Sequence, residues 1–273
     1  MLRKLLKYEF KDTARVIPFF YLITLLFAAI VFAGKQLRIG WLIGASSGIL
    51  ILVGIAVVII TFVVIAMRFN RNLYSNEGYL MFTLPVKPHI LLVSKTIVAL
   101  SWLVISFIVF IGALFIGMSG LGINDLVLYE MMSELKKYGL EKIIYGIIPL
   151  LFISVLYLLG QMFFAITVAN RPTFHDLGIA ASFLVFIATY VILKIFESIA
   201  SIFVPFSLEF NLVGKVNLSL STKNMFGYLM DIIKGIEPTT VTAGLGGYVF
   251  IVIMTFVLFY LTGLMMNKKV SLR

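Results

Sequence analysis

The stretch that decides the fold is residues 39–67, IGWLIGASSGILILVGIAVVIITFVVIAM, which contains no charged side chain. A helix needs about 20 apolar residues to cross the hydrocarbon core of a bilayer. This stretch is longer than that, and serine and threonine are its only hydroxyl-bearing residues. It therefore predicts a membrane-spanning helix.

The composition of the whole 273-residue chain agrees with this prediction, because 62% of the residues are hydrophobic and only 12% are charged. Ordinary soluble domains carry about 25% charged residues. So few charges could not cover so much apolar surface in water, which excludes a soluble globular enzyme and a disordered chain. The sequence contains no cysteine, which also excludes disulfides and thiolate metal sites.

Other apolar stretches of similar length occur along the chain. Together they predict an all-α integral membrane protein, with a single six-span domain over residues 16–273. The expected spans are 16–36, 42–67, 92–118, 143–168, 177–199 and 245–266.

Residues 1–15 form an element of a different kind. Leu2, Leu5, Leu6 and Phe10 fall on one face of a helix, and lysines and arginines occupy much of the rest. This pattern is typical of an amphipathic helix that lies on a membrane surface, with its cations near anionic headgroups. We call residues 1–15 the elbow helix and expect it to lead into the first span.

The distribution of charge predicts the orientation of the spans. If the N-terminus is cytoplasmic, the inside segments hold 13 Lys and Arg against 4 Asp and Glu, whereas the outside segments hold 8 against 7. An excess of cations is the pattern of cytoplasmic loops. We therefore expect both termini in the cytoplasm, and the net charge of +10 does not call for a nucleic-acid partner.

Three connecting segments are long enough to fold. Residues 125–138 predict a helix, with Asp125 as a possible cap, Gly139 as a stop and one apolar face comprising Leu128, Met131, Met132 and Leu135. Residues 68–90 form the cytoplasmic loop between spans two and three, and its closely spaced apolar side chains suggest contact with the membrane or with another protein. Residues 204–244 form an extracellular insertion between spans five and six. Alternating apolar residues on either side of Gly214 predict a hairpin there, and residues 225–233 fit a short amphipathic helix, so small α/β elements are expected.

The sequence offers no catalytic motif. It has no GxxxxGK[ST] loop for phosphates and no HExxH motif for zinc, so we expect no enzyme activity, no cofactor and no metal in this chain. Lys194 and Glu197 lie three residues apart in the fifth span and can form an ion pair. We expect this pair at the outer membrane interface; a proton relay is the alternative.

Two segments carry a resemblance to a known family. They are LKYEF at residues 6–10 and NEGYLMFTLPV at residues 76–86, and Ser94 and Lys95 follow at the start of the third span. With its six spans, the chain resembles the permease subunits of bacterial ATP-binding-cassette (ABC) exporters of the type II fold, especially six-span permeases common in Firmicutes. The number of spans and their topology match over the whole chain, whereas residues 76–86 are the one fairly specific motif.

The resemblance implies a division of labour. Two permease subunits, most simply a homodimer of this chain, would form the path through the bacterial cell membrane, and two cytoplasmic ABC ATPase subunits would bind ATP and Mg. A coupling helix after span two would dock on the ATPase; by position it comprises Glu77, Gly78, Tyr79, Leu80, Phe82, Leu84 and Pro85. A second cytoplasmic contact would comprise Arg171, His175 and Asp176.

Cargo is inferred from the chemistry of the spans. Spans rich in Phe, Met and Leu would line an adaptable apolar path, which suits a hydrophobic or amphipathic cargo. A peptide or peptide toxin is the favoured cargo, and a drug or a lipid is the alternative. An ion-coupled carrier or channel would need ionisable sites at mid-membrane, and the spans offer few of them. A sensor or scaffold without transport is the remaining class.

Overall fold

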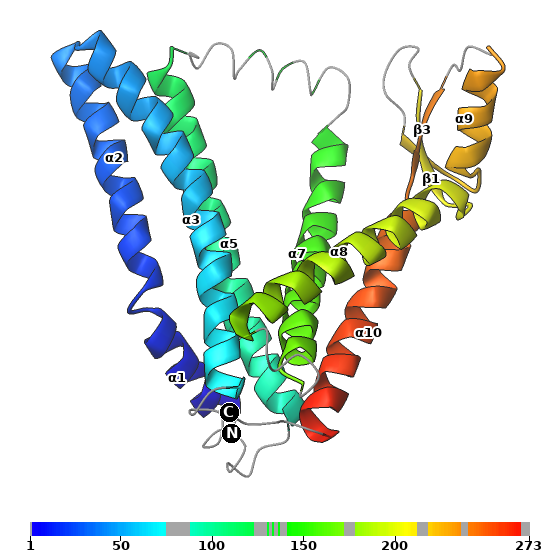
Figure 1. The fold of residues 1–273 in the computed structure, drawn as a ribbon. Helices are drawn as coiled ribbons and strands as arrows, with labels where there is room; N and C mark the ends of the chain where they lie inside the picture. The colour runs from blue at the N-terminus through cyan, green and yellow to red at the C-terminus, as the bar shows by residue number, and fades with distance from the viewer. Residues whose placement is uncertain are drawn as a thin grey trace. The chain divides into compact units, whose positions relative to one another are not determined.

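The computed structural model describes residues 2–74, 88–122, 130, 133, 136, 141–171, 178–211, 218–235 and 240–268. Six of the helices in this part of the chain are long and apolar enough to cross a membrane (Figure 1). The chain is therefore a multi-pass membrane protein, and the all-α fold expected from the sequence is confirmed. The helices group into two compact units, one within Met1–Glu130 and one within Met131–Lys269. This division into two units was not expected from the sequence.

The described part of the first unit contains four helices, which Figure 1 draws in blue to green: α1 (Leu2–Thr13), α2 (Ile17–Leu37), α3 (Gly40–Tyr74) and α5 (Pro88–Gly120). Helix α3 packs against both α2 and α5, and α1 packs against α5. The core of the unit includes Val31, Leu50 and Ala113, one residue from each of the three spans. The elbow helix therefore contacts protein as well as offering a face to the membrane.

Local sequence explains where α1 and α2 separate. The chain leaves α1 after Thr13 and enters α2 at Ile17, with Pro18 in the first turn of the new helix. Proline is favoured at the start of a helix because its fixed φ suits the first turn and its missing N–H has no helical partner there. At the other end of α2, Arg38 adopts φ 56° and donates its backbone N–H to Gly34 and Lys35, which allows α3 to begin at Gly40.

Small residues let α3 and α5 approach closely. A Cβ atom placed on Gly54 would lie 3.0 Å from the Cβ of Ala113, and one on Gly117 would lie 2.6 Å from the side chain of Ile51. Small residues commonly provide such contacts between membrane helices, because packing rather than hydrophobic burial holds these helices together in lipid. The two longest helices of the chain therefore form a tight pair.

The second unit is built on α7 (Glu141–Ala169), α8 (Gly178–Phe203) and α10 (Gly246–Lys268), each of which contacts the other two. Tyr157, Ile251 and Leu258 form a buried cluster between α7 and α10. Little of α8 is covered in this unit: the apolar segment Ala180–Phe203 contains no buried residue in its most apolar part. Helix α8 is thus the most peripheral of the three.

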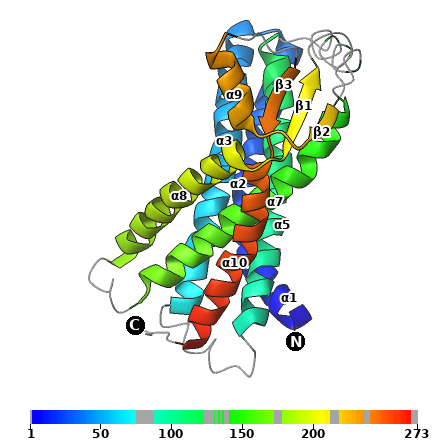
Figure 2. The same ribbon diagram turned by 90° about the vertical axis from the view of Figure 1, so that its right-hand side faces the viewer.

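A small sheet joins α8 to α10. Strands β1 (Ser207–Asn211), β2 (Leu218–Ser221) and β3 (Thr240–Gly244) are antiparallel in the order β2-β1-β3, and helix α9 (Met225–Ile233) lies beside β3 (Figure 2). The predicted hairpin and short helix are confirmed. Strand β3 was not expected, because its sequence TVTAG lacks a run of apolar side chains. Asn224 caps α9, its side chain accepting from the N–H of Gly227.

The observed helices are longer than the expected spans at several ends. Helix α3 continues to Tyr74, and α5 already begins at Pro88, so the expected loop of residues 68–90 is helical at both of its ends. These helices continue through polar residues, because a helix can extend beyond the hydrocarbon core of the bilayer. A further helix expected over residues 125–138 lies almost entirely outside the described residues.

Candidate functional site

Most of the residues assigned to ATPase contact cannot be placed. Glu77, Gly78, Tyr79, Leu80, Phe82, Leu84 and Pro85 lie outside the described residues, and so do His175 and Asp176. Arg171 is described; it is exposed directly after α7, and its backbone N–H donates to the carbonyl of Val168. The described residues that flank residues 75–87 lie at the end of α3 and at the start of α5.

The two helices that flank residues 75–87 are both attached to the elbow helix by ion pairs. Arg68, near the end of α3, contacts Asp12 on α1. Lys95, near the start of α5, donates to Oε1 of Glu9 at 2.6 Å. Glu9 belongs to one of the two segments that carry the family resemblance, and Lys95 follows the other; no sequence pattern indicated that they meet.

Burial makes the Glu9–Lys95 pair the stronger of the two constraints on the elbow helix. The side chain of Lys95 is 5% exposed and that of Glu9 is 10% exposed, whereas Asp12 is half exposed. Removing one partner of a buried ion pair leaves an uncompensated charge and typically costs about 3–5 kcal/mol. Exposed pairs contribute about 0–1 kcal/mol. The Glu9–Lys95 pair therefore fixes where α1 sits on α5.

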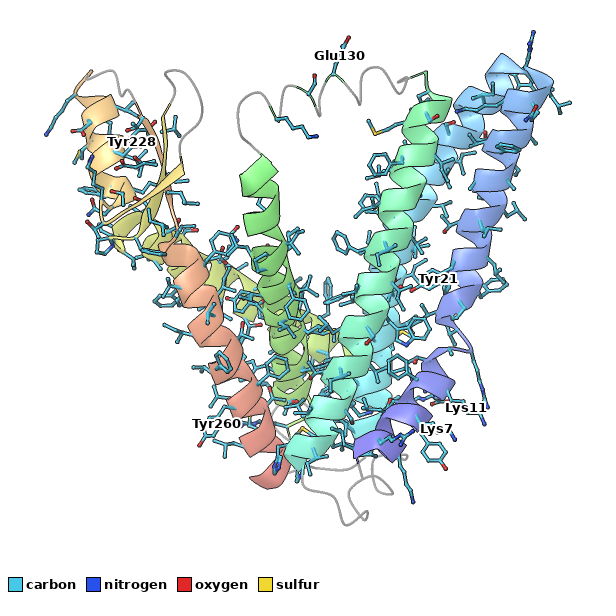
Figure 3. The ribbon with its side chains drawn as sticks, turned by 180° about the vertical axis from the view of Figure 1, so that it is seen from behind. Lys7, Lys11, Tyr21, Glu130, Tyr228 and Tyr260 are labelled. Atoms are coloured by element: carbon cyan, nitrogen blue, oxygen red, sulfur yellow. The ribbon has the colours of Figure 1, made fainter. Side chains whose placement is uncertain are left out.

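Hydrogen bonds extend this contact towards the spans. The indole N–H of Trp102 donates to Oγ1 of Thr13 at 2.7 Å, and that hydroxyl donates to the carbonyl of Glu9 at 2.8 Å. Deeper in the unit, the hydroxyl of Tyr21, which is labelled in Figure 3, bonds to Ser106 at 2.8 Å. This bond links α2 to α5.

The same serine also bonds to Thr61 of α3 at 2.8 Å. A single buried residue of α5 thus joins all three spans of the first unit. We call the side chains Glu9, Asp12, Thr13, Tyr21, Thr61, Arg68, Lys95, Trp102 and Ser106 the elbow network.

Sequence reasoning assigned the elbow helix only to the membrane surface. A signal for its protein contact was present in the charge pattern. The segments expected to lie inside carry only 4 acidic residues, and Glu9 and Asp12 are two of them, on a helix otherwise rich in cations such as Lys7 and Lys11 (Figure 3). Acidic residues in such a setting oppose the positive-inside pattern, so each invites the question of which cation it meets.

The second unit contains the charged pair expected from the sequence. Nζ of Lys194 donates to Oε1 of Glu197 at 2.6 Å, one helical turn along α8. Both residues line a cavity of about 550 Å³ between α7, α8, α10 and the end of β3. Its polar lining comprises Ser154, Tyr157, Gln161, Tyr190, Lys194, Glu197, Ser198, Ser201 and Tyr248.

Two of the lining residues have buried oxygens without a hydrogen-bond partner among the described residues. Tyr157 is 7% exposed and Gln161 is 2% exposed. The Tyr157 hydroxyl lies near the Gln161 side chain. Neither that hydroxyl nor Oε1 of Gln161 makes a hydrogen bond of good geometry in the described part of the chain. Neither residue stood out from the sequence as part of a site, because Tyr and Gln occur singly in many membrane helices.

Glycine shapes the outer wall of this cavity. A Cβ atom on Gly244 would overlap the backbone oxygen of Ser201, and one on Gly246 would overlap that of Ala200. The end of β3 therefore runs directly against the last turns of α8, and Ser201 donates to the carbonyl of Gly244 at 3.2 Å. Only glycine permits this approach, because any side chain would meet backbone that cannot move aside.

No group of His, Asp and Glu among the residues that the structure describes could hold a metal ion.

Comparison with protein-family models, with curated proteins and with solved structures finds no match to the chain. The case for a function therefore rests on the fold and on the two sites described above.

Proposed function

We propose that the chain is the membrane-spanning permease subunit of a bacterial ABC exporter, which moves a hydrophobic or amphipathic cargo, most simply a peptide, using ATP that a separate ATPase hydrolyses. The six membrane-spanning helices support the permease assignment. So does the amphipathic elbow helix that precedes them.

The observation that carries the proposal is the pair of ion contacts that hold α1 to both flanks of residues 75–87. Arg68 precedes the segment on α3, and Lys95 follows it on α5. A subunit that receives motion from an ATPase needs a stiff connection between the docking segment and its spans. The elbow network supplies such a connection, because it ties α3 and α5 to one common helix.

In this proposal the coupling residues act through buried apolar area. Tyr79, Leu80 and Phe82 would anchor the segment in a groove of the ATPase, and Glu77 would pair with a cation there. Truncation of a well-buried aromatic anchor costs about 2 kcal/mol or more of binding. ATP-driven closure of the two ATPase subunits would then move α3 and α5 together with α1, as one body.

The test is co-purification of the full chain with its ATPase from bacterial membranes. We expect a P-loop ATPase to accompany the tagged chain, and Tyr79→Ala/Phe82→Ala to reduce both its recovery and cargo-stimulated hydrolysis at least tenfold, since about 1.4 kcal/mol corresponds to a factor of ten. The matched control is Phe256→Ala/Tyr260→Ala, which removes the same side chains from an exposed face of α10.

Two results would contradict the proposal. One is unchanged ATPase recovery with Tyr79→Ala/Phe82→Ala. The other is transport by the purified chain on an ion gradient alone, which would favour an ion-coupled carrier or channel. Within the exporter class, stimulation of hydrolysis by drugs or lipids rather than by peptides would favour the alternative cargo.

A further inference from the structure

The cavity of the second unit has the chemistry of a ligand site rather than of a packing defect. Empty cavities in proteins are usually apolar, and buried polar groups are usually hydrogen-bonded. This cavity of about 550 Å³ has a mixed lining, and its polar part includes two buried side chains, Tyr157 and Gln161, whose oxygens have no hydrogen bond from described residues. A ligand with hydrogen-bond donors would satisfy both oxygens.

The ion pair in the lining is asymmetric. The side chain of Lys194 is 53% exposed, whereas that of Glu197 is 16% exposed. The cation therefore extends towards the open side, and the carboxylate stays inside. Because Lys194 donates to Oε1 only through one flexible ammonium group, Glu197 retains lone pairs for a second cation.

Aromatic residues complete the arrangement. Tyr157, Tyr190 and Tyr248 come from three different helices and all line the cavity. Aromatic rings favour organic cations over anions, because the ring face carries partial negative charge. Carboxylate, hydroxyl and amide oxygens together with tyrosine rings form the usual surroundings of a bound ammonium group.

We infer that this cavity binds the protonated primary amine of an amphipathic molecule. Glu197 is the counter-ion of the ammonium group, and Tyr157 and Gln161 accept hydrogen bonds from its N–H groups. The apolar part of the ligand extends along the lipid-facing side of α8. Binding of the amine is independent of the proposed function; only the role of the bound molecule as exported cargo rests on it.

The test measures equilibrium binding of radiolabelled octylammonium to the full chain in phosphatidylcholine nanodiscs, with empty nanodiscs as background. Octyltrimethylammonium has the same charge but no N–H donor, and octyl sulfate has the opposite charge. We expect saturable binding of octylammonium, about tenfold weaker binding of octyltrimethylammonium, and none of octyl sulfate. Equal binding of the two cations, or no saturable octylammonium binding, overturns the inference.

Substitutions assign the binding to this cavity. Tyr157→Phe and Gln161→Leu each remove one acceptor and should weaken octylammonium binding about three- to tenfold. Tyr157→Phe removes an oxygen that makes no hydrogen bond with described residues, so this variant keeps the fold. The matched control is Tyr260→Phe on the exposed side of α10, which should change affinity by less than about twofold. Equal effects of Tyr157→Phe and Tyr260→Phe would place the bound amine elsewhere.

The ion pair gives the sharpest distinction, because its two members should act in opposite directions. Glu197→Gln removes the counter-ion and should weaken binding at least about tenfold. Lys194→Met removes the internal competitor and should strengthen binding about threefold or more. If both variants weaken binding equally, the pair is merely structural and the inference fails.

The binding assay uses the chain without an ATPase, so its outcome is separate from that of the proposed function. Octylammonium binding without any associated ATPase would leave the site intact and refute the exporter. An associated ATPase with no amine binding would do the reverse. If both hold, octylammonium should stimulate hydrolysis in the wild-type complex and not in the Glu197→Gln complex.

Discussion

The elbow network of the first unit and the cavity of the second unit treat polar side chains in opposite ways. In the first unit Tyr21 bonds to Ser106 at 2.8 Å, and Glu9 meets Lys95 at 2.6 Å. In the second unit Tyr157 and Gln161 are buried, yet their oxygens have no hydrogen bond from described residues. The difference separates polar groups that hold helices together from polar groups that are left open for a ligand.

The distinction has a physical basis. A buried polar group without a partner is costly, whereas a closed network specifies one arrangement of helices. The first unit therefore gains stability from its polar residues, and the second unit gives up some stability in its cavity. Ser47, packed near Gly120, is an exception in the first unit, because its hydroxyl is buried without a described partner.

The largest effect should come from breaking the Glu9–Lys95 pair. We expect Glu9→Gln or Lys95→Met to lower the free energy of unfolding by about 3–5 kcal/mol, because each removes one partner of a buried ion pair. Reversible unfolding by SDS in mixed micelles measures this loss. The matched control is Lys7→Met on the exposed side of α1, which should have little effect.

The double variant Glu9→Met/Lys95→Met tests the cause of that loss. Replacing both charges with apolar groups should recover most of the stability, because no unpaired charge remains. A double variant as unstable as the single ones would show that the pair matters through its shape rather than through its charges.

The next effect concerns the glycines beside the cavity. Gly244→Ala should destabilise the chain by about 1–3 kcal/mol, because the added Cβ meets the backbone of Ser201. The same substitution at Gly263 on α10 has open space around it and should be neutral or slightly stabilising. Thermal unfolding of the two variants measures the difference. Equal melting temperatures would show that β3 does not press against α8.

A smaller effect compares one tyrosine from each unit directly. Tyr21→Phe removes a hydroxyl from a closed network and should cost about 1 kcal/mol. Tyr157→Phe removes a hydroxyl that makes no hydrogen bond with described residues, and should cost nothing or stabilise the chain slightly in the absence of ligand. SDS unfolding of both variants provides the comparison. A larger loss for Tyr157→Phe would contradict the difference between the units.

The smallest effect belongs to the pair on α8. Because Lys194 is half exposed, Lys194→Gln should lower stability by about 0.5 kcal/mol or less in low salt. This loss should disappear in about 1 M NaCl, where charges are screened beyond about 3 Å. Persistence of the loss in high salt would indicate a buried pair.

The spans could be predicted from sequence because length and apolarity leave few alternatives, as residues 39–67 illustrate. The hairpin and helix α9 were also predictable, from alternation and from the stop at Gly235. The ion pair of Lys194 with Glu197 followed from their spacing on one helix.

Contacts between distant segments were beyond the reach of sequence patterns. Glu9 and Lys95 are 86 residues apart, and no periodicity links them. Strand β3 forms because β1 offers it a second edge, and its own composition gives little indication of a strand. The cavity depends on which faces of α7, α8 and α10 meet. Sequence patterns do not reveal those faces, so they could not identify Tyr157 and Gln161 as lining residues.

The length of α3 has a mechanical consequence. Its 35 residues extend over about 52 Å, roughly 20 Å more than the hydrocarbon core of a bilayer. Such a helix is a lever, and α5 with 33 residues runs tightly beside it. A tilt of about 10° around the midpoint would displace each end by about 4–5 Å. Because the elbow helix is held to both helices near one end, a push on residues 75–87 would tilt the three helices together and displace the opposite ends of α3 and α5.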